Sequence, residues 1–166
     1  MTKAEDVQDE LGLLIGQLSR EGGAFVRYGR LPESGGRATL LSRIAVEVHA
    51  VAVEAHDVWA PQDSYVQAPA SLVQVEAGLV AYPPDEAAAL MVRFASEDLL
   101  WKVPLMDGPR AHSLTSRVVE VLGPDARWWS NHDDVASDCV TGCTVDGLVA
   151  GTDGTHFAVL LQACVD

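Results

Sequence analysis

The segment EVHAVAVEAHDVWA, residues 47–60, repeats a Glu-x-His unit after seven residues. Imidazoles and carboxylates are the side chains that hold transition-metal ions and that act as general acids and bases. The groups that could form a metal site are His49, Glu54, His56 and Asp57, joined by one histidine further along the chain, His132. The first question is therefore whether the repeated unit is a metal site.

The spacing of the two histidines argues against a shared metal ion. Residues seven apart on a helix are separated by two turns, about 10.5 Å, whereas a metal–ligand bond is about 2 Å long. Neither His49 nor His56 has another His, Cys, Asp or Glu three or four residues away, so the ligand pairs typical of helical sites are missing. The sequence thus predicts no metal site here and no cofactor.

Residues 41–59 are predicted to form an amphipathic helix. Apolar residues recur at the a, d and e positions of successive heptads, which places the Glu-x-His units on the solvated side. The alternative is a strand, because five valines lie between residues 46 and 58, and a strand would bring Glu47 beside His49 on one face. Strict alternation fails near Ala50, so we prefer the helix.

His-Asp doublets occur at His56–Asp57 and at His132–Asp133. They resemble the doublet of HD-type phosphohydrolases, in which neighbouring His and Asp side chains hold divalent metal ions. The match is two residues long, and the other ligands of that family have no counterpart at a suitable spacing, so the chain is not assigned to it. A metal-dependent hydrolase is kept as the alternative function, with these candidate groups: His49, His56, Asp57, His132, Asp133 and Asp134.

The cysteines and the familiar catalytic motifs give no support to an enzyme. Cys139 and Cys143 are separated by three residues, which is neither a zinc-binding CxxC pair nor a redox motif. The dinucleotide fingerprint GxGxxG, the P-loop and the nucleophile elbow GxSxG are all absent. We therefore rank a binding protein ahead of an enzyme.

A C-terminal β-hairpin is predicted by Asp153-Gly154, which lies between two apolar runs. A two-residue turn there would pair residue 152 with residue 155 and would place Cys143 opposite Cys164, within disulfide distance. The preferred interpretation is a pair of reduced thiols in a reducing compartment, and a disulfide is the alternative.

Hydrophobic periodicity and turn residues predict the remaining elements. Helices are expected at residues 3–20, 84–95 and 111–122, strands at residues 25–31 and 71–82, and a loop at residues 60–70. An alternative makes residues 88–94 a strand that pairs with LLWKVPL after Ser96. The order predicts a single α+β domain, residues 1–166, with a mostly antiparallel sheet and helices packed on it.

The charge of the chain limits its partners. Its 24 acidic and 11 basic residues give a formal net charge of −13, which repels nucleic acid and anionic membrane surfaces. No apolar run is long enough for a signal peptide or a membrane span, so we expect a cytoplasmic protein. The acidic residues form either an ordinary solvated surface or a face for a basic partner.

Trp128 and Trp129 are the aromatic residues that could anchor such a partner. They are expected to leave the core at the start of a surface loop, where one of them remains exposed beside Asp133 and Asp134, and these four are the predicted binding residues. The leading hypothesis is a small acidic binding or regulatory protein, of the immunity or inhibitor type, that acts on a protein with a basic surface. A small-ligand pocket protein is the second alternative, and a homo-oligomer is compatible with both.

Overall fold

The computed structural model describes residues 3–20, 24–33, 38–132 and 138–166. The helices are α1 (Lys3–Arg20), α2 (Leu40–Trp59), α3 (Leu72–Gly78), α4 (Pro84–Ser96) and α5 (Gly108–Leu122). The strands are β1 (Phe25–Arg30), β2 (Val80–Tyr82), β3 (Arg127–Ser130), β4 (Val145–Thr152) and β5 (His156–Cys164). No helix in these ranges is both long enough and apolar enough to cross a membrane.

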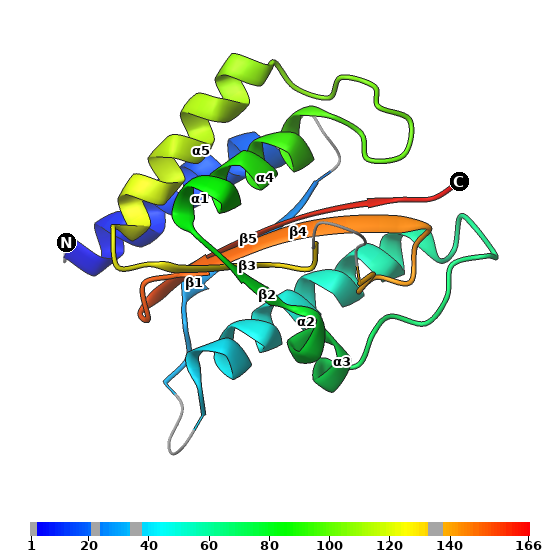
Figure 1. The fold of residues 1–166 in the computed structure, drawn as a ribbon, viewed down its shortest axis with the longest axis horizontal. Coiled ribbons are helices and arrows are strands. Elements are labelled where there is room, and N and C mark those ends of the chain that lie inside the picture. The colour runs from blue at the N-terminus through cyan, green and yellow to red at the C-terminus, as the bar shows by residue number, and fades with distance from the viewer. Residues whose placement is uncertain (1–2, 21–23, 34–37, 133–137) are drawn as a thin grey trace.

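The five strands form one antiparallel sheet in the order β1-β5-β4-β3-β2. Helices α1, α4 and α5 cover one face of the sheet, and α2 and α3 cover the other (Figure 1). The α+β class, the antiparallel sheet and the C-terminal hairpin of β4 and β5 are confirmed. Because helices lie on both faces, every residue of β5 is buried, and its sequence is an almost continuous apolar run.

Residues 40–59 form the predicted helix, and the strand alternative is wrong. The Thr39 hydroxyl caps the helix by accepting a hydrogen bond from the Ser42 amide at 3.1 Å. Two residues depart from the heptad pattern: Glu47, predicted on the solvated side, is only 5% exposed, and Val58, predicted on the core face, is 45% exposed. Glu47 also makes an ion pair. Its carboxylate lies 2.5 Å from Nε of Arg27 on β1, so this acidic side chain joins the helix to the edge of the sheet.

The strand predicted at residues 71–82 is wrong for most of its length. Ser71 and Gln74 form a capping box that starts the short helix α3, and only Val80–Tyr82 pair with β3. The alternation of apolar residues in this segment was misleading, because the local bonds of the capping box favour a helical turn. The pattern of residues 84–96 is helical as predicted, and its strand alternative is wrong.

The predicted hairpin is present, but its register differs from the prediction by two residues. Thr152 pairs with Phe157, because the Asp153 carboxylate accepts the amide hydrogens of Thr155 and His156 and widens the turn. Cys164 consequently lies opposite Val145 instead of Cys143. The two cysteines belong to hydrophobic clusters on opposite faces of the sheet, and all three cysteines are free.

Candidate functional site

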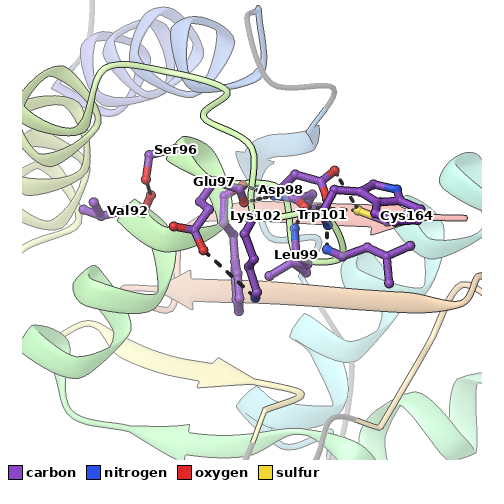
Figure 2. Close-up of polar contacts among 11 residues, drawn as sticks. Val92, Ser96, Glu97, Asp98, Leu99, Trp101, Lys102 and Cys164 are labelled. Carbon is purple, nitrogen blue, oxygen red and sulfur yellow. Dashed lines mark hydrogen bonds and ion pairs between the residues drawn. The ribbon is translucent and has the colours of Figure 1, made fainter. Parts of the chain in front are cut away.

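The chain turns tightly after α4 and exposes a tryptophan. The Asp98 amide donates to the carbonyl of Val103 at 2.9 Å, and the Lys102 amide donates to the carbonyl of Asp98 at 3.0 Å. One carboxylate oxygen of Asp98, Oδ1, accepts the amides of Leu100 at 2.9 Å and Trp101 at 2.5 Å (Figure 2). These bonds fix the backbone of the loop while the Trp101 side chain remains 65% exposed.

Gln162 of β5 anchors this loop from inside the protein. Its Oε1 accepts the Leu99 amide at 2.7 Å, and its Nε2 donates to the carbonyls of Phe94 at 2.6 Å and Glu97 at 2.9 Å. The last carbonyls of a helix have no partner within the helix, so Gln162 satisfies the end of α4. A buried amide on the central hairpin therefore determines where the exposed loop begins.

The exposed tryptophan stands at the mouth of a hollow of about 320 Å³, which we call the Trp101 pocket. Its walls come from the end of α2, the loop after α4 and the end of β5, and consist of Trp59, Asp98, Trp101, Gln162, Ala163, Cys164 and Val165. Among the described residues, the buried indole nitrogen Nε1 of Trp59 has no hydrogen-bond partner. Two indoles and one carboxylate thus line a single small pocket.

Cys164 supplies the thiol among the residues that line this pocket, and its surroundings favour the protonated form. Burial, with a further contribution from the Asp98 carboxylate, raises its pKa to about 11. The sulfur of the protonated thiol lies 3.2 Å from Oε1 of Gln162 and 3.4 Å from Oδ2 of Asp98, and its single proton is shared between these two acceptors. Figure 2 shows the contact with Asp98. Because only a thiolate is strongly nucleophilic, covalent chemistry at Cys164 is disfavoured at neutral pH.

The electrostatics of the Trp101 pocket suit a positively charged group. Within the described chain, Oδ2 of Asp98 accepts no hydrogen bond stronger than that weak thiol contact. No basic side chain lines the pocket, and the neighbouring Lys102 lies 4.0 Å from Glu97 with both side chains about half exposed. A carboxylate with an unfilled oxygen between aromatic rings can take a guanidinium or an ammonium group.

The tryptophans that were predicted to bind a partner are both in the core. Trp128 is 1% exposed and Trp129 is 6% exposed, because residues 127–130 form strand β3 instead of the expected surface loop. Their side chains enter opposite hydrophobic clusters, as neighbours on a strand must when both faces are covered. The expectation that one of the pair stays exposed is wrong, and Asp133 and Asp134 lie outside the described residues.

The candidate metal ligands are not brought together. His49, Glu54, His56 and Asp57 lie on α2, where Nδ1 of His56 is 3.1 Å from the Asp57 carboxylate. His132 lies on the opposite face of the sheet, with its ring centroid 5.0 Å from that of Phe94 on α4. Within residues 3–20, 24–33, 38–132 and 138–166, no three His, Cys, Asp or Glu side chains are grouped to hold a metal ion.

A buried carboxylate network lies on the α2 side of the sheet. Asp146 is fully buried, and it accepts hydrogen bonds from the amides of Val140 and Thr141, from the Thr141 hydroxyl and from Nδ2 of Asn131. Burial raises the pKa of Asp146, although these four bonds lower it in part. Since no solvent reaches this carboxylate, we interpret the network as the anchor of residues 138–143.

A larger hollow, of about 860 Å³, lies between residues 67–78 and residues 138–143. Its walls are mostly small side chains and loop backbone, with one carboxylate, Asp138, and no aromatic ring. It lacks the combination of rigid aromatic surface and accessible charge that the Trp101 pocket has, so we rank it second.

The residues of the Trp101 pocket were not singled out by the sequence. The sequence pattern offers the segment LLWKVPL, which contains Trp101, only as an alternative strand. The available signal was the pair Glu97–Asp98 directly after a helical pattern, because an aspartate two or three residues before an aromatic residue can accept its amide.

Comparisons with protein-family models, with curated proteins and with solved structures found no match to this chain.

Proposed function

We propose that this chain is a binding protein that holds a basic side chain of a protein partner in the Trp101 pocket. The observation that carries the proposal is a 65% exposed tryptophan beside a carboxylate oxygen that, among the residues the structure describes, has only a thiol donor. Tryptophan and arginine are the residues most enriched at the energetic centres of protein interfaces. The exposed loop would therefore contribute the anchor of the interface, and Asp98 the charge.

Arginine is the side chain that fits this pocket best. Its flat guanidinium stacks on an indole and offers several N–H donors, whereas lysine presents a more strongly hydrated point charge. A cation–π contact contributes about 0.5 to 2 kcal/mol, and a hydrogen bond to a charged group contributes about 1.5 to 3 kcal/mol. Together they favour the insertion of one arginine from a partner that supplies the rest of the interface.

The net charge of −13 supports the same type of partner. An acidic surface speeds the approach of a basic protein and slows that of an anionic one, and both effects weaken as salt is added. We infer a regulatory role, in which the chain covers a basic surface as an inhibitor or an escort does. An odd number of cysteines, in a chain large enough to fold without disulfides, supports a reducing compartment such as the cytoplasm.

The direct test uses short peptides of defined charge. The full chain is titrated with acetyl-Gly-Arg-Gly-amide and with the same peptide carrying citrulline, which has the shape of arginine without the charge, while the four indole N–H signals are followed by NMR. We expect the Trp101 and Trp59 signals to shift with the arginine peptide only. Trp128 and Trp129 do not line the Trp101 pocket, so their signals serve as internal references.

Two variants complete this test. Asp98→Asn keeps an oxygen for the amides of Leu100 and Trp101 but removes the charge, and we expect it to weaken arginine binding about tenfold. Asp125→Asn, at an exposed carboxylate in the turn before β3, is the matched control and should bind as the wild type does. Equal shifts with arginine and citrulline, or equal binding by both variants, would exclude the proposed site.

A further inference from the structure

The two edges of the sheet differ in a way that points to a second interface, independent of the Trp101 pocket. The edge formed by β2 is three residues long and is followed at once by Pro83 and Pro84, which limits further pairing. The edge formed by β1 is six residues long, and it contains no proline. Of the two edges, β1 is therefore the one suited to accept another strand.

Alternate residues of β1 direct their backbone groups away from the sheet. Leu31, just after the strand, donates its amide to Thr155 at 2.7 Å, so the odd-numbered residues of β1 bond to β5. The amides and carbonyls of Val26, Tyr28 and Arg30 consequently face outward. Unpaired groups in such a row are a template for strand addition.

This outward row is self-complementary. If two copies approach antiparallel about a twofold axis at Tyr28, Val26 of one copy meets Arg30 of the other, and the two Tyr28 residues meet each other. Every outward residue then exchanges both of its backbone hydrogen bonds. On the opposite face, Arg27 of one copy lies beside Gly29 of the other, which has no side chain to obstruct it.

Apolar side chains on α1 and β1 lie beside this edge, where they could contact a second copy. Tyr28 lies flat against Gly12 of α1, where an added Cβ would come within 2.8 Å of its ring. Next to it, Leu13 is 70% exposed, and a hollow of about 440 Å³ is lined by Asp9, Gly12, Leu13 and Tyr28. The twofold axis brings the Tyr28 and Leu13 side chains of both copies together over these hollows.

Two copies that each carry a net charge of −13 repel one another at long range, so the contact must rest on backbone bonds and apolar side chains, and added salt should strengthen it. Arg27 is neutralised within each copy by Glu47, whose carboxylate lies 2.5 Å away.

We propose that the chain forms a homodimer in which the β1 strands of two copies pair antiparallel, so that the two five-stranded sheets become one continuous sheet.

The test is the oligomeric state of the full chain in solution. Sedimentation velocity over a series of concentrations should give twice the chain mass of 17.7 kDa for the wild type. Arg30→Pro removes one outward amide and leaves the bonds to β5 in place, so it should yield a folded monomer. Arg30→Ala, which keeps the amide, should remain a dimer.

A second pair of variants tests the side-chain contact without changing the backbone. Leu13→Asp should raise the dimer dissociation constant at least tenfold, because it brings two carboxylates together at the axis. Val73→Asp, at a 78% exposed position on α3, is the matched control and should not change it. A wild type that sediments as a monomer at every concentration, or a dimer that persists in both Arg30→Pro and Leu13→Asp, would overturn the proposal.

Discussion

At the scale of single residues, Asp98 and Asp146 show how surroundings decide the role of a carboxylate. Both accept two backbone amides, but Asp146 is fully buried and receives two further donors from Thr141 and Asn131. Asp98 lines a pocket and keeps one oxygen that meets only a thiol. Asp146 is thus committed to the fold, whereas Asp98 can still accept a hydrogen bond from a partner.

The buried network makes Asp146 the carboxylate whose loss is most costly. Asp146→Ala removes the acceptor of the Val140 and Thr141 amides and leaves buried donors without a partner, which costs about 3 to 5 kcal/mol. Asp125→Ala, at an exposed position, should change the free energy of unfolding by less than about 0.5 kcal/mol. Urea unfolding of both variants measures the difference, and equal midpoints would contradict this prediction.

The protonation of Cys164 predicts a loss of stability in alkali. Its pKa is raised from the ordinary 9.0 to about 11, so the native state holds the thiol proton more tightly than the unfolded chain does. The resulting stabilisation is complete below pH 9 and is lost as the pH rises towards 11. At a pH of about 10.5 the wild type should have lost about 2 kcal/mol more than Cys164→Ala, relative to pH 8.

Urea unfolding of both proteins at the two pH values measures this loss. Lysine and tyrosine residues also titrate in this pH range, but they are the same in both proteins. Their contributions therefore cancel when the stability loss of the variant is subtracted from that of the wild type. A wild type and a variant that lose the same stability would show that the thiol is not shielded from solvent in the folded protein.

At the scale of elements, β5 connects the interior to the exposed loop through Gln162. Gln162→Leu removes the partners of the Leu99 amide and of two carbonyls at the end of α4, and we expect it to cost about 2 to 5 kcal/mol. Because these bonds position the loop, arginine-peptide binding should weaken in the same variant at a temperature where the protein remains folded.

The control for this element is Gln62→Leu, since Gln62 is exposed and bonds only the Val58 carbonyl through its side chain. Thermal unfolding followed by circular dichroism and the NMR titration are measured on both variants. If Gln162→Leu were destabilised but bound the arginine peptide normally, the loop would be held by its own bonds and not by β5.

Sequence periodicity identified the long helices correctly, because many residues report the same period, and it also identified the short strand β1. Helix α2 is the clearest case, since the heptad pattern outweighed its five valines. The two features that periodicity misplaced were each decided by local hydrogen bonds. The capping box of Ser71 made α3, and the Asp153 carboxylate moved the hairpin register, and neither effect changes the hydrophobic pattern.

At the scale of the whole molecule, the antiparallel sheet lies between helical layers whose two hydrophobic clusters share β3, β4 and β5. This layering explains why the candidate site was not predictable. Whether a tryptophan is exposed depends on which elements cover it, and Trp128 is buried by helices that are distant in sequence. The preference for a basic partner rests on net charge, which does not depend on the fold, and it stays a prediction.

The position of β1 has a consequence for synthesis of the protein. Residues 25–30 find their partner strand only at residues 156–161, so the ribosome must add more than a hundred residues before the pairing can form. Until then both edges of β1 lack a partner strand, and α1 lacks its contact with β5. The nascent chain is consequently exposed to chaperones and to aggregation for most of its translation, and native pairing of its first strand follows the emergence of β5.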